Sequence, residues 1–271
     1  KSRLIREFHR RLSDYPFKPT IFQGRTDQRL THVPYGLLRD LLVRHFGIEE
    51  SDRGATIERK ITDSLAAAFP AGRANRADGL RARAGMIGRL VGLDLPATTP
   101  TTATRRRSAD RQQSIAVLLE YLEAVIHRSA ASLFFLEDIH WADEDSLALL
   151  ERIAAFAAGA PLLMIGLARP TLYEWRPGWP GECGAPTTML PLLPLSEVDS
   201  RELVFSILRK LPQIPATLSD LIVQSAAGNP FYVEELVRVL IEDGVIVPSE
   251  KTWQVRPHAL TRLRVPATLT G

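Results

Sequence analysis

The sequence predicts an α/β fold: a three-layer αβα core followed by a helical subdomain and a C-terminal hairpin. Two observations predict it. First, two apolar runs of strand length, residues 133–136 and 162–168, lie on either side of an amphipathic helix. Continuous apolarity is typical of parallel strands buried on both faces, and strand, helix, strand is the βαβ pattern of an α/β domain. Second, the chain changes to helices alone from residue 196.

Composition narrows the class of protein. The chain has 271 residues, 45% hydrophobic and 24% charged, which is the balance of a globular protein with an ample core. Its single cysteine, Cys183, excludes an intrachain disulfide and indicates a reducing, cytoplasmic setting. No apolar run approaches the ~20 residues of a membrane span, and the N-terminus is typical of a basic amphipathic helix rather than a signal peptide.

The charge balance gives little reason to expect a nucleic-acid partner. The net charge of +3 comes from 34 basic and 31 acidic residues. The tightest basic run, residues 105–107, lacks the interleaved aromatic side chains of a nucleic-acid site, so a solvated loop explains it.

The N-terminal half alternates helical and extended patterns. Residues 2–12 place apolar side chains on one helical face, and Pro16 and Pro19 end that helix. We expect a strand at residues 20–23, helices at 37–46, 57–69 and 79–92, an exposed Pro/Thr-rich loop at 95–104, and a strongly amphipathic helix at 115–126.

The C-terminal half continues the α/β pattern and then leaves it. After the two apolar runs comes an irregular connector, residues 172–186, and residues 189–193 are predicted to form a last strand. Ser196 and Asn229 are predicted N-caps of helices, and Gly244 is predicted to end the last helix. We place a nucleotide-binding core at residues 1–195, a helical lid at 196–244, and the start of a winged-helix-like region, including a hairpin, at 245–271.

The strongest chemical signal is the acid pair Glu137-Asp138, which ends the first apolar run. Ligands of open α/β sheets bind outside the carboxyl ends of the strands. Two carboxylates there suit a magnesium nucleotide: one holds the metal or its water, and the other orients or deprotonates the attacking water. The alternative is that the two acids only end the strand and cap the next helix.

Three further signals are weaker alone. Lys1-Ser2 at the start of a helix matches the end of a Gly-rich phosphate-binding loop, although any chain can begin with this pair. Arg169 follows the second apolar run, where an arginine can reach a γ-phosphate or form a surface salt bridge. Gly228-Asn229-Pro230 marks a helix stop followed by a helix start.

Together these segments resemble the STAND class of AAA-like P-loop ATPases, found in bacterial regulators and in multidomain proteins with class III nucleotide cyclases. The resemblance covers nearly the whole chain, and residues 34–42 and 265–271 are most similar to the cyclase-associated branch. The matching segments are Leu136-Glu137-Asp138-Ile139-His140-Trp141-Ala142-Asp143 (Walker B), Gly166-Leu167-Ala168-Arg169-Pro170 (sensor 1), Gly228-Asn229-Pro230-Phe231 (Gly-x-Pro segment) and Lys1-Ser2-Arg3-Leu4 (the end of Walker A).

The resemblance implies a site for ATP and Mg²⁺. Lys1 would contact the β- and γ-phosphates, and Ser2 and Glu137 would hold Mg²⁺. Asp138 would activate water, and Arg169 would sense the γ-phosphate.

The helical lid would close over the nucleotide through Gly228, Asn229 and Pro230. The family often has Asp where this chain has Glu137, so slow turnover is expected. The Gly-rich loop and its strand do not precede Lys1 in this sequence. We therefore expect the 271-residue chain to bind ATP poorly, to be unstable, and to be inactive by itself.

The implied function is an ATP-binding, slowly hydrolysing switch in a signal-transduction protein. The resemblance implies ATP and ADP as ligands, a cyclase or transcriptional output domain in the same protein, a C-terminal repeat sensor, and nucleotide-dependent self-association. Two alternatives remain: a non-catalytic nucleotide-binding scaffold, and a DNA-binding regulator that uses the C-terminal hairpin as a wing.

Overall fold

The computed structural model describes residues 2–69, 77–95, 104–157, 159–181 and 185–256. The chain forms two compact units, residues 1–188 and 189–271, and each is described by itself. Lys1, Cys183, most of the predicted loop at 95–104 and the cyclase-like segment 265–271 lie outside the described residues.

The first unit is built on a parallel sheet of three strands in the order β1-β2-β3. The register places Arg25 opposite Glu137, and Leu136 opposite Gly166, so the three strands end at one edge. This confirms the predicted α/β class. The strands are β1 (Thr20–Arg25), β2 (Ser132–Glu137) and β3 (Leu162–Gly166).

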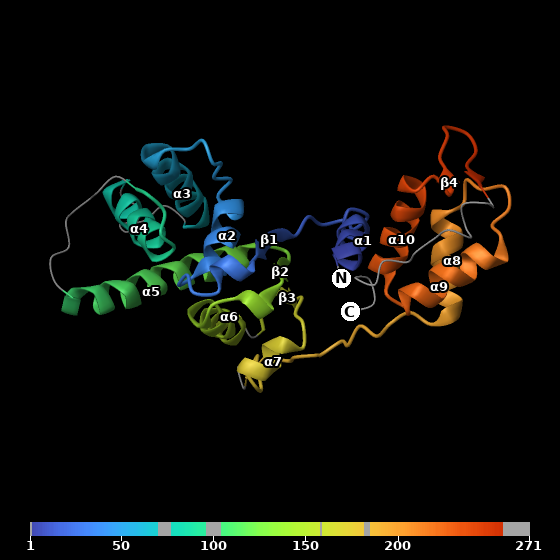
Figure 1. The fold of residues 1–271 in the computed structure, drawn as a ribbon. Coiled ribbons are helices and arrows are strands. Elements are labelled where there is room, and N and C mark those ends of the chain that lie inside the picture. The colour runs from blue at the N-terminus through green and yellow to red at the C-terminus, as the bar shows by residue number, and fades with distance from the viewer. Residues whose placement is uncertain (1, 70–76, 96–103, 158, 182–184, 257–271) are drawn as a thin grey trace. The chain divides into compact units, whose positions relative to one another are not determined.

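Helices cover both faces of the central strand β2 (Figure 1). Leu133 and Phe135 pack with Ile5 of α1 (Ser2–Leu12), while Phe134 and Leu136 belong to the larger core on the other face. The continuous apolar run predicted this two-sided burial. The helices of the larger core are α2 (Gly36–His45), α3 (Gly54–Ala68), α4 (Ala77–Leu90), α5 (Thr104–Arg128) and α6 (Glu144–Phe156).

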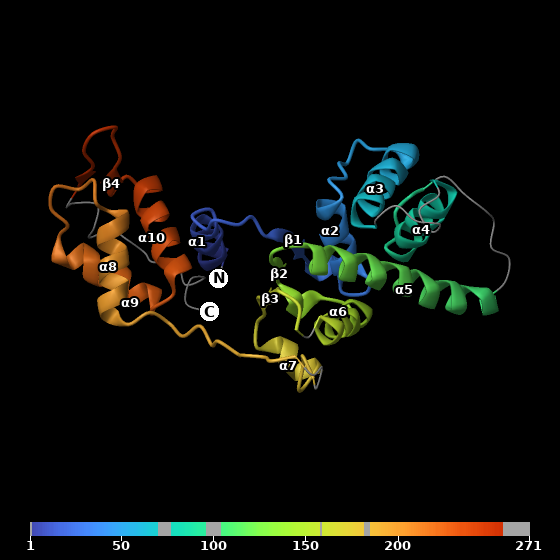
Figure 2. The ribbon, with the colours of Figure 1, turned by 180° about the vertical axis from the view of Figure 1, so that it is seen from behind.

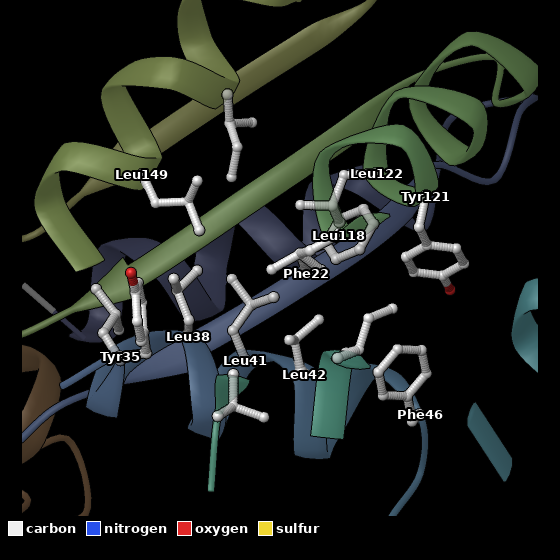
Figure 3. Packing of buried hydrophobic residues seen from close by; sticks show 14 of the residues in the cluster. Phe22, Tyr35, Leu38, Leu41, Leu42, Phe46, Leu118, Tyr121, Leu122 and Leu149 are labelled. Atoms are coloured by element: carbon white, nitrogen blue, oxygen red, sulfur yellow. The ribbon is translucent and has the colours of Figure 1, made fainter. Parts of the chain in front are cut away.

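The larger core is layered by aromatic and leucine side chains. Phe22 of β1 stacks on Phe134 of β2, with ring centroids 4.4 Å apart. Figure 3 shows Leu38, Leu41 and Leu42 of α2 beside the side chains of α5. Helices α3 and α4 pack together and against α5, as the view from behind also shows (Figure 2). This helical group separates β1 from β2 in sequence yet leaves them paired.

Two strand predictions need correction. The run at residues 162–168 was expected to be buried on both faces, but β3 is only partly buried and Leu163 is 46% exposed. Residues 189–193, predicted as a last strand, form none, and Leu190 is 80% exposed. β3 is an edge strand that pairs with β2 alone within the described chain, so it is covered less completely than the central strand, and residues 189–193 pair with no described strand.

The second unit is helical, with a short antiparallel hairpin. The two predicted caps are confirmed: the Ser196 hydroxyl accepts from the amide of Asp199 (3.1 Å), and the side-chain oxygen Oδ1 of Asn229 accepts from the amide of Phe231 (3.1 Å). The unit begins at Met189, and its division into lid and winged-helix-like region stays a prediction. Its elements are α8 (Glu197–Ile207), α9 (Ala216–Ala226), α10 (Pro230–Glu242), β4 (Ile246–Val247) and β5 (Gln254–Val255).

In the described part of the chain, no helix combines the length and apolarity that a membrane crossing requires.

Candidate functional site

The candidate site lies at the edge where the parallel strands end. Glu137 is the last residue of β2, and Asp138 follows it in the left-handed region (φ 56°, ψ 33°). Non-glycine residues occupy this region infrequently, and Asp tolerates it better than most. The chain therefore turns sharply after β2 and enters the short helix η3 (Ile139–Trp141) with both acids half-buried at the edge.

Hydrogen bonds with the residues that follow β1 and β3 hold this turn. Thr26, which is 2% exposed, donates its amide to the carbonyl of Glu137 (3.2 Å) and its hydroxyl to the carbonyl of Trp141 (3.1 Å). On the other side, the amide of Ile139 donates to the carbonyl of Leu167 (3.1 Å). The backbone that carries the two acids is therefore fixed from both sides.

Asp138 forms an ion pair with Arg25 of β1, with Nε and Oδ2 3.3 Å apart. The strand register explains the pair, because Arg25 lies opposite Glu137 and hence beside Asp138. The side chains are 65% and 37% exposed, so the pair contributes at most about 1 kcal/mol. It is a weak restraint that a ligand could displace. No local pattern predicts this pair, because 112 residues, from 26 to 137, separate the partners.

Asp143 joins two helices at the same edge. Its carboxylate, in a residue only 6% exposed, accepts the amides of Tyr35 (2.8 Å) and Gly36 (3.0 Å), at the start of α2. It also accepts the amide (2.9 Å) and hydroxyl (2.5 Å) of Ser146, at the start of α6. The positive ends of two helix dipoles thus meet one buried anion. The spacing of Asp143 and Ser146 could have indicated the cap of α6, but no local pattern indicates the contact with α2.

Arg169 follows β3 and lines a pocket of about 400 Å³ beside the acid-bearing turn. Most of the lining is apolar. It comes from η3, the first residue of α6 and the short helix α7 (Thr171–Trp175), which packs against η3. The main lining residues are His140, Trp141, Ala142, Glu144, Arg169 and Trp175.

The predicted phosphate-binding residues are only partly described. Lys1 lies outside the described residues; Ser2 begins α1, but its side chain lies outside the described part. The helix itself packs on the sheet: the ring of His9 meets the ring of Phe135, with centroids 4.3 Å apart. Contact of Lys1 and Ser2 with a nucleotide therefore stays a prediction.

The segment Gly228-Asn229-Pro230 lies in the second unit, between α9 and α10. Gly228 has a φ of 77°, and a Cβ there would lie 2.5 Å from the carbonyl oxygen of Leu195. Its own carbonyl accepts the amide of Leu195 (2.8 Å). Glycine is required here by both conformation and space, which gives this residue a structural reason independent of any ligand.

The donor chemistry at the edge fits a magnesium nucleotide. Among the residues that the structure describes, no group of three or more His, Cys, Asp or Glu side chains could enclose a metal. Glu137 and Asp138 offer an incomplete set of hard oxygen donors. Mg²⁺ commonly uses one or two carboxylates and completes its shell with waters and substrate phosphates.

Comparison with known proteins identifies the family of the first unit. The family model described as "AAA ATPase domain" matches residues 1–165, which include both β1 and the acid pair. The chain belongs to the AAA ATPase domain family. Membership implies nucleotide binding and hydrolysis, and AAA ATPases generally bind ATP and Mg²⁺.

A relative from Rhizobium meliloti (strain 1021), an uncharacterized protein, is 33% identical over 133 residues. The match covers 47% of this chain and 12% of the relative, so the chain spans a small part of that protein's length. No solved structure gives a significant match.

Proposed function

We propose that this AAA ATPase domain is a slow, ATP-dependent switch of a signal-transduction protein. The observation that carries the proposal is the acid pair Glu137-Asp138, fixed at the carboxyl edge of a parallel sheet by hydrogen bonds with the residues that follow both neighbouring strands. At that edge Glu137 would hold Mg²⁺, directly or through water, and Asp138 would accept the proton of the attacking water.

Slow turnover follows from two features of these acids. Glu137 is one methylene longer than the Asp common at this position in the STAND class. Asp138 is paired with Arg25 (Nε to Oδ2, 3.3 Å), and this pair must open before the carboxylate can turn to the attacking water. Slow hydrolysis suits a switch, because each nucleotide state then lasts long enough to be sensed.

The remaining site assignments are part of the same proposal. Lys1 and Ser2 would bind phosphate and Mg²⁺, Arg169 would sense the γ-phosphate, and residues 228–230 would close over the nucleotide. We propose that the nucleotide state sets the position of the helical unit and thereby controls an output domain in the same protein, such as a cyclase or a transcriptional regulator.

Phosphate release by the full-length protein tests the catalytic part. We expect Mg²⁺-dependent release of phosphate from ATP, and a loss of about 100-fold or more in Asp138→Asn, with ATP binding retained. Asp145→Asn, a change to an exposed acid in the first turn of α6, is the matched control and should leave the rate unchanged. An Asp138→Asn variant as fast as the wild type would favour the alternative of a non-catalytic nucleotide-binding scaffold.

Limited proteolysis tests the switch. We expect ATP and ADP to give different cleavage patterns around residues 189–195, which join the helical unit to the core. Identical patterns together with identical output activity would contradict the switch while leaving hydrolysis intact.

A further inference from the structure

We propose that the pocket between η3 and α7 binds a planar aromatic anion. This goes beyond the proposed function and does not depend on ATP hydrolysis. The pocket has a volume of about 400 Å³, within the range of roughly 300–1,000 Å³ of small-molecule sites. The proposal depends on its charge and on its aromatic lining.

The cation in the pocket lining is Arg169. The acid in the lining, Glu144, forms an ion pair with Arg176 (2.6 Å), a guanidinium that also pairs with Glu151 (3.1 Å). Throughout the described residues, no ion pair or side-chain hydrogen bond engages the guanidinium of Arg169. One cation without an ionic partner therefore faces a mostly apolar space, and a guanidinium matches a carboxylate or phosphate in geometry as well as in charge.

Two tryptophans supply the aromatic lining. Trp141 comes from η3 and is half-buried, whereas Trp175 comes from α7 and is 44% exposed. Indole faces favour flat rings, which gain stacking as well as burial.

The ligand is therefore a molecule that carries a flat ring system and an anionic group. Two sources share this chemistry: a free aromatic acid and a nucleoside monophosphate. The pocket does not include Glu137 or Asp138, so the ligand would bind beside the acid pair rather than on it.

Calorimetric titration of the protein tests the proposal with three probes: 2-naphthoate, its neutral counterpart 2-naphthylmethanol, and AMP without Mg²⁺. We expect Arg169→Gln to weaken the binding of 2-naphthoate about tenfold or more, the effect of losing one charge-assisted hydrogen bond, and to change the binding of 2-naphthylmethanol less than threefold. Trp175→Ala should weaken both naphthalene probes.

Matched controls separate the pocket from the rest of the surface. Arg81→Gln removes an exposed arginine of α4, and Tyr15→Ala removes an aromatic ring that is 58% exposed outside the pocket; both should bind like the wild type. Asp138→Asn should also leave 2-naphthoate binding unchanged, so failure of the ATPase proposal and failure of this one are distinguishable. Circular dichroism checks that each variant is folded.

Tighter binding of 2-naphthoate than AMP would identify a free aromatic acid as the occupant. Tighter binding of AMP, lost in both Arg169→Gln and Trp175→Ala, would identify a nucleotide. The proposal is overturned if neither anion binds, or if Arg169→Gln affects the charged and neutral naphthalenes equally.

Discussion

Replacing Asp143 by alanine removes one carboxylate that holds the starts of two helices. The residue is 6% exposed and accepts four hydrogen bonds, three from backbone amides and one from the Ser146 hydroxyl. Hydrogen bonds to charged groups contribute about 1.5–3 kcal/mol each, and loss of an N-cap costs about 1 kcal/mol. Since the four bonds share one carboxylate, these values are not additive, and we expect a loss of about 3–5 kcal/mol.

A neighbouring acid provides the control. Asp145 lies in the first turn of α6, but its side chain is 43% exposed and pairs with Arg111 at the surface. An exposed pair of this kind contributes about 1 kcal/mol or less, so Asp145→Ala should be nearly neutral. The difference between the two variants therefore isolates the buried contacts with α2.

Urea unfolding followed by circular dichroism and tryptophan fluorescence gives the free energies of unfolding. For domains whose stability is about 5–15 kcal/mol, a loss of 3–5 kcal/mol moves the midpoint far outside experimental scatter. If Asp143→Ala and Asp145→Ala unfold at the same urea concentration, the buried carboxylate does not hold α2 and α6 together, and the reasoning is refuted.

Three further predictions concern the other contacts. Burial lowers the pKa of His45 to about 4, so this side chain takes up a proton in the unfolded chain before it does so in the folded chain as the pH falls. The free energy of unfolding should therefore be highest above about pH 6.5 and decline by roughly 3 kcal/mol towards pH 4. Unfolding of His45→Phe, measured over the same pH range, should show a flatter profile. Gly228→Ala should lower the free energy of unfolding, measured by thermal unfolding, by at least about 2 kcal/mol. The loss should exceed that of Gly244→Ala, because Gly244 has a similar φ of 69° but a Cβ there would meet no atom within 4 Å. Equal losses in the two variants would mean that backbone strain alone, and not the contact with Leu195, disfavours a side chain at residue 228. Arg25→Ala should speed phosphate release up to about fivefold, which corresponds to the free energy of about 1 kcal/mol that one exposed ion pair contributes. Slower release by this variant would mean that Arg25 assists the reaction.

Local patterns predicted most of the fold because their physical causes are local. The run at residues 133–136 indicated a strand buried on both faces, and the structure places α1 on one face and the larger core on the other. The Asn229-Pro230 signal predicted the start of α10, where Asn229 caps the helix. Apolar composition alone failed at residues 189–193, because a strand requires a pairing partner that sequence composition does not provide.

The site was predictable only in part, for a related reason. Glu137 and Asp138 stood out because a strand ended in two acids. The contacts of Asp143 with the start of α2 and of Arg25 with Asp138 join positions about a hundred residues apart, and no spacing rule predicts them. The Trp141–Trp175 lining likewise depends on how α7 packs against η3.

The central claim is that the acids closing β2 form a magnesium-nucleotide site. The most direct measurement is the affinity of the full-length protein for ATP with and without Mg²⁺, compared with that of Glu137→Gln. We expect Mg²⁺ to tighten ATP binding to the wild type by about tenfold or more, and we expect this gain largely to disappear in the variant. The same gain in both proteins would contradict the central claim.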